Sequence, residues 1–104
     1  MYARVTNIRF PPSVGEEVVS VARGLSPVLE RQQGFKGLDV INSPHAGEGI
    51  IISFWETVAD AEAGEGTPAY IGQMSRMSSF LSGRLDPKTY EVNVRTQASE
   101  GAGG

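Results

Sequence analysis

Few side chains of this sequence combine a chemically useful type with a position suited to a binding site. Asn7 alternates with Ala3 and Val5, so the pattern places an amide on an otherwise apolar strand face. An amide both donates and accepts hydrogen bonds, and it could bind a substrate carbonyl or a peroxy intermediate. We therefore take Asn7 as a candidate catalytic residue. The alternative is an amide whose hydrogen bonds are satisfied by nearby backbone.

Trp55, the only tryptophan, ends an apolar run that begins at Gly49. A short run rich in β-branched and aromatic residues predicts a strand buried on both faces. The indole could stack on an aromatic substrate and donate its N–H, which makes Trp55 the second candidate catalytic residue. The alternative is a core tryptophan without chemistry. Ser53 lies two residues earlier on the same strand face and is a candidate substrate-binding residue.

Tyr70 and Met74 are separated by one helical turn and form a third candidate group, for substrate binding. The helix that carries them is predicted to begin at Thr67 and Pro68, a capping residue followed by proline at the first helical position. The alternative is that both side chains belong to the hydrophobic core.

Other kinds of chemistry find little support in the composition. The chain lacks cysteine, has His45 as its single histidine, and has no glycine-rich loop after a strand, so we expect no metal site and no nucleotide or other cofactor. A net charge of −3 gives no electrostatic reason to expect a nucleic-acid or membrane partner. Without cysteines or an apolar leader, we expect a cytoplasmic protein.

The elements that would position these residues alternate in a recognisable order. With 104 residues, the chain predicts one domain at 1–96, followed by a flexible Gly/Ser/Ala-rich tail at 97–104. The predicted strands are 2–10, 35–41, 49–55 and 89–96. The predicted helices are a first helix that begins at residue 14 and ends at Gly34, and two more at 58–63 and 68–81. Gly24 and Pro27 predict a break within the first helix. The order β-α-β-β-α-β predicts an α+β, ferredoxin-like split unit.

This topology leaves one face of the predicted sheet uncovered. Right-handed crossovers put the helices on one face, with strands 2–10 and 49–55 at the centre of the sheet. Ser53 and Trp55 would then point toward the helices, whereas Ile52 and Phe54 would point away from them. A second copy of the chain could cover those apolar groups, so we expect a homodimer that associates through its sheet faces.

Four short motifs resemble those of the antibiotic biosynthesis monooxygenase family, and the resemblance spans residues 2–96. The motifs are Gly34-Phe35-Lys36-Gly37, Phe54-Trp55-Glu56-Thr57, Pro68-Ala69-Tyr70 and Tyr90-Glu91-Val92. The resemblance implies a dimeric α/β barrel in which two ferredoxin-like sheets face each other. This agrees with the homodimer expected from the uncovered face.

The resemblance also implies a pocket between the sheet and the helices, and an activity. Enzymes of this family include cofactor-independent monooxygenases that oxidise quinols or aromatic polyketides, small aromatic molecules that react with oxygen after deprotonation. A related branch degrades haem with an Asn, a Trp and a His on the second helix; Asn7 and Trp55 match by position, but the histidine is absent, so haem degradation is not expected. The alternative function is a non-catalytic dimer that binds a small ligand or acts as an interaction module. We identify no general base in the sequence.

Overall fold

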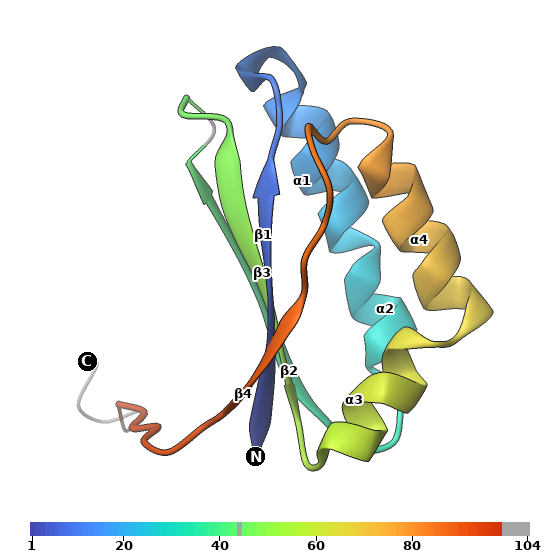
Figure 1. Cartoon of the computed structure of the whole chain (residues 1–104), viewed down its shortest axis with the longest axis vertical. Coiled ribbons are helices and arrows are strands. Elements are labelled where there is room, and N and C mark those ends of the chain that lie inside the picture. Colours follow the sequence, from blue (N-terminus) through green and yellow to red (C-terminus); the bar gives the residue numbers. More distant parts are fainter. Residues whose placement is uncertain (44, 99–104) are drawn as a thin grey trace.

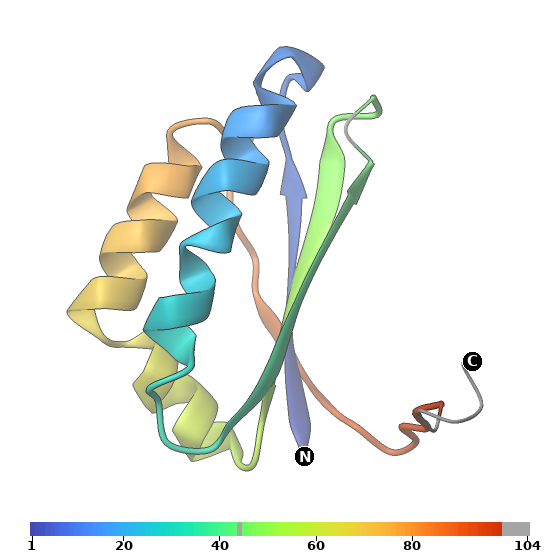
Figure 2. The same ribbon diagram turned by 180° about the vertical axis from the view of Figure 1, so that it is seen from behind.

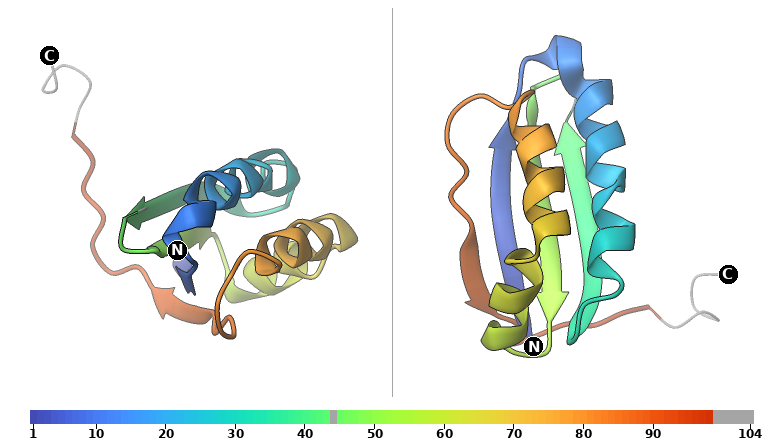
Figure 3. Two further views of the ribbon diagram at one scale, coloured as in Figure 1. Left: turned by 90° about the horizontal axis from the view of Figure 1, so that it is seen from above. Right: turned by 90° about the vertical axis from the view of Figure 1, so that its right-hand side faces the viewer.

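Four antiparallel strands form a single sheet, and the α-helices of the described residues all cover the same face of it (Figures 1 and 3). The computed structural model describes residues 1–43 and 45–98. In chain order its elements are β1 (Tyr2–Arg9), the 3-10 turn η1 (Pro12–Val14), α1 (Gly15–Arg23), α2 (Leu25–Leu29), β2 (Phe35–Ser43), β3 (Glu48–Trp55), α3 (Val58–Glu65), α4 (Pro68–Ser78) and β4 (Lys88–Glu91).

The strand order β2-β3-β1-β4 is that of the ferredoxin-like unit. The central strands β1 and β3 pair along their whole lengths, from Tyr2 opposite Trp55 to Arg9 opposite Glu48. The predicted α+β fold class and the central position of these two strands are confirmed. No helix among the described residues has both the length and the apolar character needed to cross a membrane. The cytoplasmic location stays a prediction.

The two faces of the sheet differ as the alternation in β3 predicts. Ile51, Ser53 and Trp55 are buried beneath the helices, with at most 4% of any of these residues exposed. The intervening Ile52 and Phe54 are only partly buried, because no helix or strand within the described part of the chain crosses their face of the sheet (Figure 2). We call this uncovered side the open face.

The predicted break in the first helical segment is confirmed. Gly24 separates α1 from α2, and the side chain of Gln73 on α4 donates a hydrogen bond to the Val21 carbonyl oxygen at 2.7 Å. The same carbonyl oxygen also accepts from the Gly24 N–H at 3.0 Å, and the Gln73 contact ties α4 to α1 at the break. The largest fully buried side chains are Trp55, Leu25, Leu29, Met77 and Val18.

The last strand is shorter than the predicted 89–96. Glu91 pairs with Tyr2, the first residue of β1, so β1 offers no partner strand to the residues that follow. One more hydrogen bond, from the Val92 N–H to the Met1 carbonyl oxygen at 2.9 Å, ends the ladder. The chain then leaves the sheet, as Figure 1 shows. Of the flexible tail predicted at 97–104, residues 99–104 lie outside the described residues.

Candidate functional site

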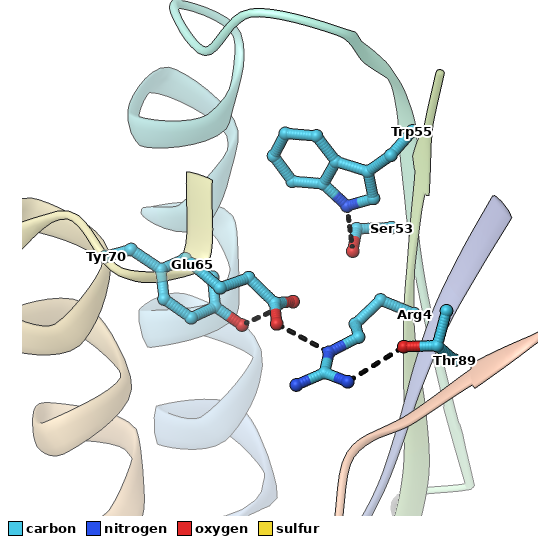
Figure 4. Close-up of polar contacts among 6 residues, drawn as sticks. All are labelled: Arg4, Ser53, Trp55, Glu65, Tyr70 and Thr89. Carbon is cyan, nitrogen blue, oxygen red and sulfur yellow. Dashed lines mark hydrogen bonds and ion pairs between the residues drawn. The ribbon is translucent and has the colours of Figure 1, made fainter. Parts of the chain in front are cut away.

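Trp55 is fully buried at the end of β3, and its N–H group is already bonded within the protein. The indole Nε1 donates to Ser53 Oγ at 2.8 Å, and both residues lie on the helix-covered face (Figure 4). Phe35 packs edge-to-face on the indole, with ring centroids 5.5 Å apart. Trp55 therefore anchors the sheet beneath α3, and its N–H has a buried acceptor in Ser53.

Beside this pair, polar side chains from three parts of the chain meet between the sheet and the helices (Figure 4). Arg4 on β1 donates from Nε to Glu65 Oε1 at 2.7 Å and from Nη1 to Thr89 Oγ1 at 2.9 Å. The Tyr70 hydroxyl donates to the other carboxylate oxygen, Glu65 Oε2, at 3.4 Å. The Arg4 and Glu65 side chains are only 26% and 12% exposed, so the ion pair is largely shielded from water.

The turn between α3 and α4 places Glu65 and Tyr70 together. Thr67 Oγ1 donates to the Gly64 carbonyl oxygen at 3.1 Å and accepts from the Tyr70 N–H at 3.3 Å. One side chain thus closes the end of α3 and caps the start of α4, and Pro68 occupies the first turn of α4. The predicted cap is confirmed, and it fixes the two site residues on either side of the corner.

These groups line a cleft of ≈ 370 Å³, which we call the sheet–helix cleft. Its lining residues are Arg4, Thr6, Glu62, Glu65, Gly66, Tyr70, Met74, Leu85 and Pro87. The last two belong to the segment that leads into β4, which runs beside α4 and β1 in Figure 1. A mostly apolar hollow of a few hundred Å³ with a small number of polar groups is typical of small-molecule sites.

The electrostatics of the cleft keep Tyr70 in its neutral form. Burial raises the pKa of Tyr70 well above its ordinary value of 10.0, the negative charge of Glu65 and the hydrogen bond to it raise it further, and Arg4 opposes the shift. Tyr70 is therefore a hydroxyl donor at neutral pH, next to a guanidinium and a carboxylate. Such a set can stabilise a developing oxyanion and can accept a proton.

The structure brings some of the predicted site residues together and separates others. Tyr70 and Met74 line the sheet–helix cleft, and their role in substrate binding stays a prediction. Ser53 and Trp55 lie beside it, and they are buried instead of lining its wall.

Asn7 lies on the other face of the sheet, so one pocket cannot contain both Asn7 and Trp55. Asn7 pairs with Ile50 in the β1–β3 register and shares its face, which is the open face, whereas Trp55 points toward the helices. There Asn7 is exposed and lines a second hollow of ≈ 400 Å³. The expectation that Asn7 and Trp55 act together in one pocket is therefore wrong, because the strand register places them on opposite faces of the sheet.

Sequence reasoning missed Arg4 and Glu65. Glu65 stands between Gly64 and Gly66, two residues after the predicted end of its helix at 63, whereas the structure makes it the last residue of α3. Arg4 shares its strand face with Thr6 and Ile8, which are buried in the structure, and a charge on such a face requires a counter-charge opposite it. Within 1–43 and 45–98, no three His, Cys, Asp or Glu side chains cluster closely enough to hold a metal ion.

Comparison with protein-family models and with curated proteins gives no match to this chain. The similarity is to solved structures. A provisionally assigned antibiotic biosynthesis monooxygenase from Nitrosomonas europaea matches with a TM-score of 0.79 and 16% sequence identity, over 90% of this chain and 100% of its own. The chain has the antibiotic biosynthesis monooxygenase fold.

Two further structures with this fold match as well. The provisionally assigned antibiotic biosynthesis monooxygenase from Bordetella bronchiseptica has a TM-score of 0.78 and 13% identity, covering 89% of this chain and 97% of its own. The corresponding protein from Deinococcus radiodurans has a TM-score of 0.77 and 10% identity, covering 95% and 99%. The resemblance predicted from short motifs is confirmed at the level of the fold.

Proposed function

We propose that the protein is a cofactor-independent monooxygenase that acts on a quinol-like or polycyclic aromatic substrate in the sheet–helix cleft. The observation that carries the proposal is the convergence of Arg4, Glu65 and Tyr70 in a largely apolar cleft. The fold shared with antibiotic biosynthesis monooxygenases supports the same reaction class. A largely apolar cleft with a cation and a neutral hydroxyl suits an aromatic molecule whose oxygen becomes anionic.

The proposed reaction uses the substrate as its own source of electrons. Loss of a proton from an acidic CH₂ group next to the aromatic rings gives an enolate, whose oxygen would be stabilised by Arg4 and Tyr70. The carbanionic carbon adds O₂ to form a C–O bond and, after protonation, a hydroperoxide. Loss of water from the hydroperoxide leaves a carbonyl group, so one oxygen atom stays in the product and the other leaves as water. Met74, Leu85 and Pro87 would keep bulk water from the anion.

We further propose that two copies associate through their open faces. Ile41 and Tyr90 on that face are 54% and 52% exposed, and Ile50, Ile52 and Phe54 lie between them. A second sheet would remove these apolar groups from water while leaving both sheet–helix clefts on the outer sides of the dimer.

Oxygen consumption with a panel of hydroquinones and anthrones tests the proposed activity. We expect uptake above the autoxidation rate for at least one substrate, with a loss of at least about 10-fold in Tyr70→Phe, because a positioned oxyanion donor is removed. Tyr90→Phe is the matched control, since that hydroxyl lies on the open face, away from the cleft. Uptake at the autoxidation rate throughout the panel would contradict the proposal.

The alternative is a non-catalytic dimer that binds a small aromatic ligand. One observation favours it: the donors of Arg4 and Tyr70 are engaged by Glu65 and Thr89 in the structure. This function predicts that panel compounds raise the melting temperature and change the fluorescence of Trp55 without any oxygen uptake. The same panel therefore distinguishes the two functions.

A further inference from the structure

Glu65 offers the cleft one firmly held oxygen and one loosely held oxygen. Oε1 receives the short 2.7 Å hydrogen bond of Arg4, whereas Oε2 receives the Tyr70 hydroxyl at 3.4 Å. The second distance is beyond the usual 2.5–3.0 Å of an O–H···O hydrogen bond, so Oε2 can exchange Tyr70 for a better donor at little cost. The carboxylate is thus oriented by Arg4 and has an oxygen free to meet a substrate.

The other titratable groups near the cleft are less suited to accept a proton. Glu62 also lines the cleft, but it is exposed on the solvent side of α3. His45 is exposed in the β2–β3 turn and is absent from the lining. Tyr70 holds its own proton because burial and the Glu65 carboxylate oppose its ionisation. Glu65, whose side chain is only 12% exposed, is the carboxylate that lines the cleft in a shielded position.

The contacts of Glu65 hold its carboxylate in one orientation. Glu65 is the last residue of α3, and Arg4 on β1 contacts Oε1 at 2.7 Å. A proton arriving on Oε2 leaves this Arg4 contact to Oε1 in place.

We propose that Glu65 is the catalytic base that takes the substrate proton, an inference that rests on the proposed monooxygenase function. In this step the substrate C–H bond breaks, the proton bonds to Oε2, and the electron pair stays on the substrate as an enolate. Tyr70, released from Oε2, turns its hydroxyl toward the enolate oxygen. No oxidation occurs until O₂ adds; Glu65 then returns its proton to the peroxide anion, which gives the hydroperoxide and restores the carboxylate.

Proton removal can be measured without oxygen, which separates Glu65 from the oxygenation. Anthrone is incubated with the protein in deuterated buffer under nitrogen, and exchange of its methylene protons is followed by proton NMR. We expect the wild-type protein to accelerate exchange and Glu65→Gln to lose at least about 100-fold of the acceleration, as for removal of a general base. Glu65→Asp has a side chain shorter by one methylene group, so its carboxylate lies further from the substrate and should keep part of the acceleration. Glu56→Gln is the control: its carboxylate is 61% exposed and lies outside the cleft lining, so the variant should exchange at the wild-type rate.

The possible outcomes separate the two proposals. If Glu65→Gln still accelerates the exchange, Glu65 is not the base, and the monooxygenase proposal is unaffected. Oxygen uptake without any accelerated exchange would lead to the same conclusion. Exchange that depends on Glu65, without oxygen uptake, would support the base and contradict the monooxygenase. Absence of both activities would overturn both. Circular dichroism of each variant confirms that it is folded, and Glu65→Asp retains the charge that Arg4 requires.

Discussion

Trp55 packs against the backbone of Gly64 so closely that no side chain could stand between them. A Cβ on Gly64 would overlap Cη2 of the indole and lie 2.7 Å from Cζ3. Since Gly64 directly precedes Glu65, the indole sets how closely the end of α3 approaches the sheet and therefore the depth of Glu65 in the cleft. Trp55 thus acts on the site by positioning α3, with Ser53 holding the indole in place.

This contact predicts that Gly64→Ala destabilises the protein. The added methyl group must displace a buried indole, and overpacking of this kind costs roughly 1–3 kcal/mol. Thermal unfolding should show a melting temperature lower by roughly 4–8 °C for each kcal/mol. Gly72→Ala on α4 is the control: a Cβ there meets no atom within 4 Å, so the substitution should stabilise the helix slightly. Equal effects of the two substitutions would refute the packing account.

The hydrogen bond between Ser53 and Trp55 predicts coupled effects of their substitution. Ser53→Ala leaves a buried indole N–H without its acceptor, which costs roughly 1–3 kcal/mol of unfolding free energy. In a Trp55→Phe background that donor is gone, so the same substitution should cost much less. A double-mutant cycle by urea unfolding measures the difference. An identical cost of Ser53→Ala in both backgrounds would show that the bond contributes nothing.

The fold was accessible from the sequence because its signals are local. The alternation in β3, the Gly24 break and the Thr67 cap each depend on residues within one or two turns of each other, and all three predictions are confirmed. The length of β4 was not accessible in this way. It is limited by where β1 begins, at Tyr2, and that limit appears only once the two strands are paired.

The site was less accessible because it depends on long-range register. The sequence places Asn7 on one face of its own strand, but which face meets the helices follows from the pairing of β1 with β3. Arg4 and Glu65 are 61 residues apart, and neither belongs to a local sequence motif from which their contact could be predicted. That Tyr70 and Met74 lie together could be predicted, because their helical spacing alone places them side by side.

The Arg4–Glu65 ion pair should contribute more to stability than an exposed pair. Arg4→Met leaves a 12% exposed carboxylate without its charged donor, and hydrogen bonds to charged groups contribute roughly 1.5–3 kcal/mol. The matched control is Lys36→Met, which breaks the exposed pair with Glu56 at 3.2 Å and should cost at most about 1 kcal/mol. Urea unfolding of both variants measures the contrast. Similar losses would mean that the cleft is as well solvated as the surface.

The raised pKa of Tyr70 predicts a stability loss in alkali. Above the ordinary value of 10.0 the unfolded chain releases the Tyr70 proton while the folded chain still holds it, so the free energy of unfolding must fall as pH rises. The contribution is complete below that value. Unfolding by urea from roughly pH 8 to roughly pH 11 should therefore show a steeper decline for the wild type than for Tyr70→Phe. Parallel pH profiles would be inconsistent with a shielded Tyr70.

The proposed dimer can be tested with two isoleucines of nearly equal exposure on opposite sides of the molecule. Ile41 on the open face is 54% exposed and Ile71 on α4 is 56% exposed, so lysine at either position should leave the fold of one copy intact. If the open faces associate, Ile41→Lys buries a charge in the interface and should produce monomers, whereas Ile71→Lys should remain dimeric. Analytical ultracentrifugation over a range of concentrations measures both masses. A monomeric wild-type protein, or a dimer disrupted by Ile71→Lys alone, would place the interface elsewhere or exclude it.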